Sequence, residues 1–176
     1  PNPTQGYKPK AALVAAICNK YPQVAAVNLV HLDESYFIEL KNALKREVAL
    51  YVPLEGSMHT FALGADGLVQ GQMNMLPGTF RRYADLLVNR EAGEIGKVLS
   101  DLVRTIQYTN PWGHTYARVV KMFMRVLRLP GWEGGMREPC RMPRDEVLQK
   151  FADGLLRLRV PEIDDMAKAA GLSMPG

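Results

Sequence analysis

Short apolar runs alternate with helical patterns in the first part of the chain, and this alternation limits the fold more than any other feature. The runs at 24–30 and 48–53 are almost entirely apolar and contain β-branched residues, which is typical of strands buried on both faces of a parallel sheet. A third strand is predicted at 68–71. Helices are predicted before the first strand, at 9–19, and between the strands, at 36–46 and 57–63, the one at 36–46 capped by Asp33 or Ser35. Strands and helices at this spacing predict right-handed βαβ units, and hence an α/β fold with a parallel sheet.

The second part of the chain contains no strand pattern. Helices are predicted at 77–89, 91–108, 114–129, 143–157 and near 161–170, and the glycine-rich stretch 129–135 is predicted to be an irregular loop. Three parallel strands are too few for a finished sheet, because their outer edges and one or both faces would remain open. We therefore expect the strands to be part of a larger sheet or barrel whose other strands lie elsewhere.

Composition excludes several classes of protein. The chain has 176 residues, 47% of them hydrophobic and 23% charged, with a net charge of +4, which is typical of a globular domain. No apolar run is long enough for a membrane span, and residues 1–10 contain no signal-peptide core. Cys18 and Cys140 are far apart and lack metal-site spacing, so we expect free thiols and a cytoplasmic protein. A start at Pro1 without Met predicts processing or a piece of a longer protein.

Four phrases resemble one known family, and they occur in its order. Residues 64–77 (GADGLVQGQMNMLP) resemble Gly-x-x-Gly-Val-Ile-Ser-Gly-x-x-Asn-x-x-Pro around the last barrel strand of the dihydrodipicolinate synthase and N-acetylneuraminate lyase family. Residues 21–28 resemble its Pro-Asn-Val-Val-Gly-Ile-Lys stretch on the sixth strand. Residues 135–139 resemble the Arg-x-Pro between its late helices, and residues 2–4 the Tyr-Asn-x-Pro that closes its fifth strand. The resemblance covers about residues 2–158.

This resemblance implies a fold and an activity. The family consists of pyruvate-dependent class I aldolases and lyases on a (β/α)8 TIM barrel, so residues 1–90 would be the C-terminal part of such a barrel, with its last three strands. Residues 91–176 would be the C-terminal helical extension. The resemblance implies a C–C bond lyase that acts on pyruvate or another 2-keto acid, without a cofactor. It also implies a homo-oligomer, or a second chain that supplies the N-terminal half.

The departures from the family pattern concern its chemistry. Asn28 stands where the family has its Schiff-base lysine, and an amide nitrogen is not nucleophilic. Lys20 precedes the strand and Lys41 lies on the next helix, so neither is a substitute. Pro1 stands where the family has its proton-relay tyrosine, and the family's Thr-Thr pair belongs to the N-terminal half. We therefore expect the chain alone to be inactive. The alternative is a non-catalytic ligand-binding or regulatory homologue that needs a partner chain.

Candidate site residues follow from the barrel geometry, because the carboxyl ends of the strands form its active face. They are Asn28, Glu55, Val69 and Gln72, with His31 as a further possibility. Val69 matches the aliphatic residue under the pyruvate in the family, although a plain core valine is the alternative. Asn28 is either a hydrogen-bonding group for a ligand or a strand-end amide satisfied by the backbone.

Other polar patterns have ordinary alternatives. Glu55 and His59 are spaced for an acid–base dyad, or for a surface or capping pair, which we favour. The three histidines, His31, His59 and His114, lack ligand spacing, so we predict no metal site. The residues Arg118, Lys121, Arg125 and Arg128 share one helix face, which could bind a nucleic acid or another polyanion. We favour a solvated face of an amphipathic helix, paired with Glu or Asp at an oligomer contact.

Overall fold

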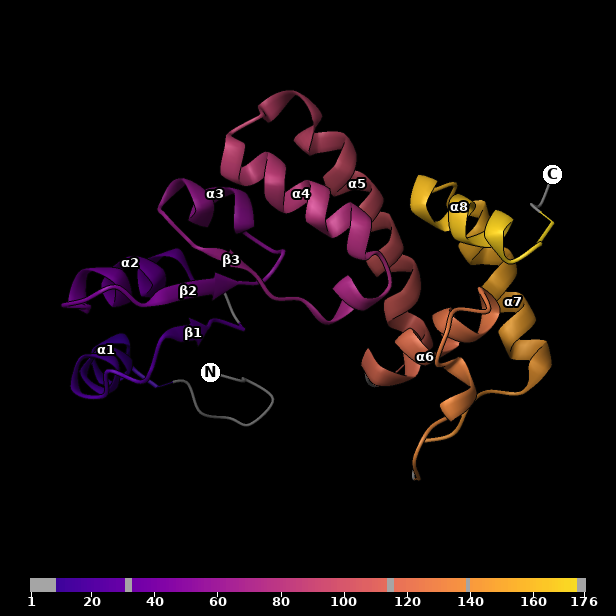
Figure 1. Cartoon of the computed structure of the whole chain (residues 1–176), viewed down its shortest axis with the longest axis horizontal. Helices are drawn as coiled ribbons and strands as arrows, with labels where there is room; N and C mark the ends of the chain where they lie inside the picture. The colour runs from indigo at the N-terminus through magenta and orange to yellow at the C-terminus, as the bar shows by residue number, and fades with distance from the viewer. Residues whose placement is uncertain (1–8, 31–32, 114–115, 139, 174–176) are drawn as a thin grey trace. The chain divides into compact units, whose positions relative to one another are not determined.

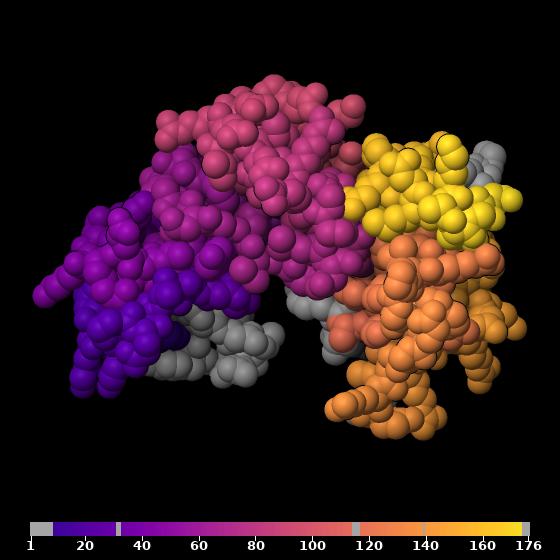
Figure 2. Space-filling model, viewed as in Figure 1, coloured from indigo at the N-terminus to yellow at the C-terminus, as the bar shows by residue number. Residues whose placement is uncertain are grey.

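The computed structural model describes residues 9–30, 33–113, 116–138 and 140–173, apart from the side chain of Tyr116. The chain divides into two compact units, Pro1–Gln70 and Gly71–Gly176. Figure 1 labels the helices and strands, and Figure 2 shows the surface in the same colours. The division of the sequence at residues 90 and 91 into a barrel part and an extension stays a prediction.

The first unit contains a parallel sheet whose strands alternate with helices, as the sequence predicts. Its elements are α1 (Ala11–Lys20), β1 (Ala26–Asn28), α2 (Glu34–Ala43), β2 (Ala49–Val52), α3 (Ser57–Ala62) and β3 (Gly67–Leu68). The described strands form one sheet in the order β1-β2-β3, and both pairs are parallel. Two successive right-handed crossovers between neighbouring strands place their helices on the same face of a sheet.

Only one face of this sheet is buried. Asn28 pairs with Tyr51, and Tyr51 pairs with Gly67, so these three residues lie on one face, and the face with Leu50 and Val52 is the opposite one. The opposite face carries the buried side chains of the sheet, Leu29, Leu50, Val52 and Leu68. Ala26 and Asn28 are exposed, so the prediction that the first strand is buried on both faces is wrong. The reason is that the crossover helices occupy only one face.

Helix α2 begins at its predicted cap but ends earlier than the sequence predicts. Asp33 caps α2 by accepting hydrogen bonds from the backbone N–H of Ser35 and Tyr36, which confirms one of the two predicted caps. Helix α2 ends at Ala43 rather than at Arg46. The guanidinium of Arg46 instead donates to carbonyls of α1 and of the loop after it, those of Cys18, Tyr21 and Val24.

The third strand is also shorter than predicted. It comprises only Gly67 and Leu68, although the hydrogen bond from Val69 N to the Val52 carbonyl continues the ladder by one residue. Gly71, predicted as its last residue, instead begins the 3-10 helix η2 (Gly71–Asn74). The side-chain amide of Asn74 donates to the Gly71 carbonyl over 2.9 Å, which closes this turn.

The second unit is helical, and its described residues contain no strand. Its elements are η2, α4 (Pro77–Asn89), α5 (Ala92–Thr109), η3 (Asn110–Trp112), α6 (Tyr116–Val126), η4 (Trp132–Gly134), α7 (Asp145–Arg157) and α8 (Pro161–Ala169). Each predicted helix is present, within a few residues of the predicted ends. Helix α4 packs on α5, α6 on α7, and α7 on α8. The largest buried side chains of this core are Phe80, Tyr83, Phe123 and Phe151.

Candidate ligand site at the carboxyl edge of the sheet

The three strands are parallel, so their carboxyl ends meet at one edge of the sheet. Asn28 ends β1 at this edge, on the uncovered face, and its side chain is exposed. Among the described residues, none forms a hydrogen bond with its carboxamide, and its role as a ligand contact stays a prediction. The carboxamide of Asn28 can therefore donate to, and accept from, a ligand on this face.

Val69 lies on the same face as Asn28. It follows Leu68, whose side chain is buried on the opposite face, and strand alternation turns the next residue to the uncovered side. Val69 is 43% exposed, and its role against a substrate stays a prediction. An amide and an aliphatic side chain thus share one open surface, and this is the composition that a small polar ligand with an apolar part requires.

Glu55 follows β2 at the same edge and is exposed. Its predicted pairing with His59 is wrong, because His59 Nδ1 lies 2.8 Å from Glu34 Oε1 of helix α2. Gly56 precedes helix α3 with a φ of 73°, so Glu55 is outside the helix and the four-residue spacing does not place it on the face of His59. His59 and Glu34 form an exposed hydrogen bond on the surface.

Gln72 belongs to the second unit and is 3% exposed. Its Nε2 donates to Asn110 Oδ1 over 3.2 Å, and its Oε1 has no hydrogen-bond partner among the described residues. The structure thus places Asn28, Val69 and Glu55 at one edge of one sheet, and gives Gln72 a partner within the helical unit. Its assignment to a substrate site stays a prediction.

Tyr51 is a residue of this face that the sequence analysis missed. It lies between Asn28 and Gly67 in the register, and its ring covers Gly67, where an added Cβ would lie 2.6 Å from two ring carbons. Its hydroxyl group can donate a hydrogen bond to a carboxylate or carbonyl group. The only signal that could have found Tyr51 is its pairing with Asn28, and a single sequence does not give the register of non-local strands.

Several sequence-based expectations fall outside the described residues. They concern Pro1 and residues 2–4, His31, His114 and Pro139 of the Arg-x-Pro phrase. Within the described residues, no three or more His, Cys, Asp or Glu side chains are grouped so that they could hold a metal ion. The helices of the described part were also compared with the length and apolarity that a membrane span needs, and none of them meets both. Cys18 is a buried free thiol, and Cys140 is a half-buried one.

The basic face predicted on residues 118–128 is largely engaged within the helical unit. Lys121 Nζ donates to the Gly131 carbonyl over 3.0 Å, and Arg125 pairs with Asp145 over 3.0 Å. Arg128 lies beyond the end of α6, and its guanidinium donates to the Ala170 carbonyl. Arg125 is therefore paired with an acidic residue of its own chain, while pairing at an oligomer contact and nucleic-acid binding by this face stay predictions.

Comparison with solved structures identifies the fold of this chain. No model of a known protein family matches the sequence, and no curated protein matches it. Solved structures do match. The dihydrodipicolinate synthase of Bacteroides thetaiotaomicron is 20% identical with a TM-score of 0.71, over 86% of this chain and 52% of that one. The chain has the fold of dihydrodipicolinate synthase structures over about half of their length.

Two further structures with the dihydrodipicolinate synthase fold extend the comparison. The enzyme from Cyanidioschyzon merolae, solved with lysine bound, is 17% identical with a TM-score of 0.69, and the match covers 98% of this chain and 53% of that one. The prophage protein YagE of Escherichia coli K12, solved in complex with pyruvate, is 13% identical with a TM-score of 0.71, and the match covers 90% of this chain and 54% of that one. This chain thus spans about half the length of the structures that it matches.

Proposed function

We propose that this chain supplies the C-terminal half of a dihydrodipicolinate synthase-like (β/α)8 barrel, with the last three strands in residues 1–90 and the helical extension in residues 91–176. The observation that carries the proposal is the uncovered face of the sheet. Parallel sheets are almost always covered on both faces, and in a barrel the second face is filled by side chains from the other strands. The match to half of each barrel structure supports the same reading.

The completed site would bind a small 2-keto acid such as pyruvate without forming a covalent bond to it. Asn28 occupies the place of the Schiff-base lysine, and an amide nitrogen cannot attack a carbonyl carbon to form an iminium. It can donate a hydrogen bond to the carbonyl or carboxylate oxygen of the keto acid, with Val69 against the methyl group. Tyr51 and Glu55 are the further candidates for substrate contacts on this face, while Gln72, the remaining sequence-based candidate, belongs to the helical unit. The protein would then be a non-catalytic relative of the aldolases.

The barrel would be completed by further strands, which would cover the sheet face that carries Asn28. These strands belong either to a longer form of the same polypeptide or to a second chain, and the assembled barrel would be a homo-oligomer. The outer edges of β1 and β3 lack a strand partner among the described residues, so they are the places where further parallel strands would pair.

Reductive trapping tests the absence of a Schiff base. The chain is incubated with pyruvate and sodium borohydride, and its intact mass is compared with that of the Bacteroides thetaiotaomicron dihydrodipicolinate synthase treated in parallel. We expect a mass increase for the synthase and none for this chain. A stoichiometric, pyruvate-dependent increase mapped to one lysine of this chain would overturn the assignment of Asn28.

A thermal melt of the isolated chain, together with its sedimentation behaviour, tests the need for a partner. We expect the sheet unit to melt without cooperativity, because one face of its core is open to water. A monomeric chain whose sheet unit melts cooperatively would contradict the half-barrel proposal, whatever the outcome with borohydride.

A further inference from the structure

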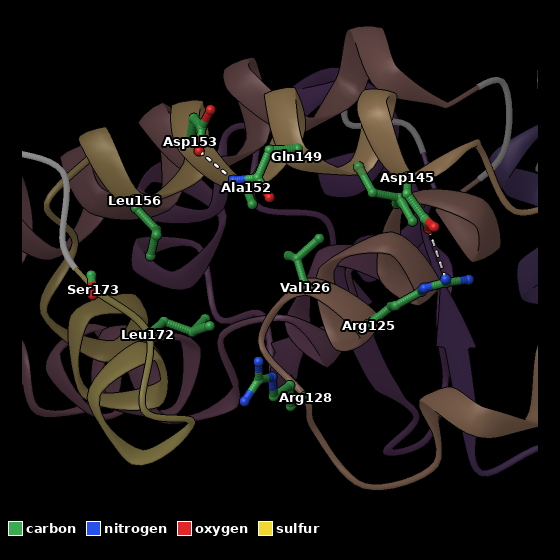
Figure 3. A pocket seen from close by; sticks show the side chains of 11 residues that line it. Arg125, Val126, Arg128, Asp145, Gln149, Ala152, Asp153, Leu156, Leu172 and Ser173 are labelled. Carbon is green, nitrogen blue, oxygen red and sulfur yellow. Dashed lines mark hydrogen bonds and ion pairs between the residues drawn. The ribbon is translucent and has the colours of Figure 1, made fainter.

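A cavity of about 570 Å³ lies within the helical unit, between α6, α7 and the segment that follows α8. Figure 3 shows side chains from these three segments around it. Its apolar lining consists of Val126, Leu148, Ala152, Leu156 and Leu172. Leu172 is fixed in place by the end of α8, where Leu172 N donates to the Ala167 carbonyl and Gly171 takes a φ of 67°. A cavity of this volume with an apolar lining has the size and character of a small-molecule site.

The charged side chains of the lining are unequally paired. Arg125 forms an ion pair with Asp145, and Asp153 accepts a hydrogen bond from Gln149 over 2.8 Å. Arg128 lies on the opposite side of the opening from Asp153 in Figure 3. Its guanidinium has one described partner, the Ala170 carbonyl at 3.3 Å, which uses one of its five N–H groups. Arg128 is thus the cation of the described lining that no carboxylate neutralises.

The backbone at Arg128 favours another residue type. Its φ is 52°, a left-handed conformation that Gly and Asn adopt at lower cost than Arg. The Arg side chain starts from this conformation immediately after α6 and reaches the rim of the cavity. Asn can therefore replace Arg128 without loss of the turn, which gives a clean way to remove its charge.

We propose that this cavity binds a small monocarboxylate with an apolar body, whose carboxylate pairs with the Arg128 guanidinium. The planar guanidinium matches a carboxylate with two parallel hydrogen bonds. The apolar lining accepts a chain or a ring, as its five aliphatic side chains predict. Asp145 and Asp153 would repel a dianion such as a phosphate monoester, so one negative charge is favoured. The site is contained in the helical unit and does not depend on the completion of the barrel.

The test is a titration of the chain with 4-phenylbutyrate, followed by protein nuclear magnetic resonance. We expect saturable shifts at residues of α6, α7 and 171–173, and binding at least about tenfold weaker for the neutral 4-phenylbutanamide. Arg128→Asn should weaken the binding of 4-phenylbutyrate by a similar factor and leave the affinity for 4-phenylbutanamide unchanged. Ala152→Leu places a larger side chain in the cavity and keeps Arg128, so it should weaken the binding of both ligands.

Arg90→Asn is the matched control. Arg90 follows α4 with a φ of 58° and does not line the cavity, so the variant makes the same change of charge and residue type in the same backbone conformation. It should leave both affinities unchanged. Equal weakening by Arg90→Asn and Arg128→Asn would overturn the proposal, as would equal binding of the acid and the amide, shifts outside the cavity only, or no saturation with either ligand.

Discussion

The carboxylate of Glu162 caps helix α4 at Thr79, a residue 83 positions earlier in the chain. Glu162 Oε2 accepts hydrogen bonds from Thr79 N at 2.6 Å and Thr79 Oγ1 at 2.5 Å, and Oε1 accepts one from Gly78 N at 2.8 Å. The helix has no side-chain cap at its own N-cap residue, Leu76. An acceptor from α8 thus satisfies N–H groups that the first turn of α4 leaves unpaired, and it places a negative charge at the positive end of the helix dipole.

Glu162→Gln should lower the free energy of unfolding by about 1–2 kcal/mol, because it removes the charge and turns an amide donor toward other donors. Glu162 also lies in the first turn of α8, so the single variant mixes two effects. Combining it with Thr79→Val in a double-mutant cycle isolates the hydrogen bond from Thr79 Oγ1 to Glu162, because both backbone N–H donors remain in the variant. A coupling energy of about 0.5–2 kcal/mol is expected from urea denaturation, and additivity of the two changes would contradict a contribution of this side-chain hydrogen bond.

Gly67→Ala should destabilise the sheet unit by about 1–3 kcal/mol, since the new methyl group would lie 2.6 Å from the ring of Tyr51. The φ of Gly67 is not in the left-handed range, so lack of space and not backbone strain is the cause. When Tyr51→Ala removes the ring, adding Gly67→Ala should destabilise the sheet unit much less. Hydrogen exchange of the β2 and β3 amides measures the effect as a change in local opening free energy, which does not require a cooperative transition. An equal loss with and without the tyrosine ring would show that the contact is unimportant.

Arg46→Lys should loosen the end of α1 and the loop that leads to β1. Arg46 donates to the carbonyls of Cys18, Tyr21 and Val24, with distances of 2.9, 3.1 and 2.5 Å, and an ammonium group cannot reproduce that planar arrangement. We expect faster amide exchange at residues 17–24, by an amount that corresponds to a loss of about 1–3 kcal/mol in local opening free energy. The control is Arg81→Lys, in an exposed pair with Asp85, which should change stability by at most about 0.5 kcal/mol. Equal effects of the two variants would contradict the role of Arg46.

Tyr108 should make the helical unit less stable at high pH. Burial, and secondarily the charge of Asp153, raise the pKa of Tyr108 from 10.0 to about 12, while its hydroxyl donates to the Phe151 carbonyl over 2.8 Å. A raised pKa means that the folded chain holds the proton more tightly than the unfolded chain. The stability from Tyr108 is therefore complete below about pH 10 and is lost as the pH rises from about 10 to 12.

Tyr108→Phe tests this pH dependence. The variant should be less stable than the parent at neutral pH, because the hydrogen bond is lost, and the difference should shrink between about pH 10 and 12. Urea denaturation at several pH values measures it, with Tyr21→Phe, at an exposed tyrosine, as the control. A difference that stays constant over this range would contradict the assignment.

The candidate site shows where sequence reasoning succeeded and where it did not. The positions of Asn28 at the end of β1 and of Val69 directly after β3 are readable from the sequence, because they depend on local motifs around single strands. The exposure of both residues is not, because it depends on which layers cover the sheet. His59 illustrates the same limit: its spacing from Glu55 suggested one partner, but Glu34, 25 residues away, is the one that it contacts.

The sequence by itself determined the elements of this protein and their order. Apolar periodicity, the Asp33 cap and the prolines at helix starts act within a few residues, so they fix the helices, the parallel strands and the helical second part. Only the tertiary structure decided the strand register, the single buried face of the sheet, the cap of α4 by Glu162 and the cavity beside Arg128. Each of these depends on contacts between distant segments, whose geometry the local pattern does not contain.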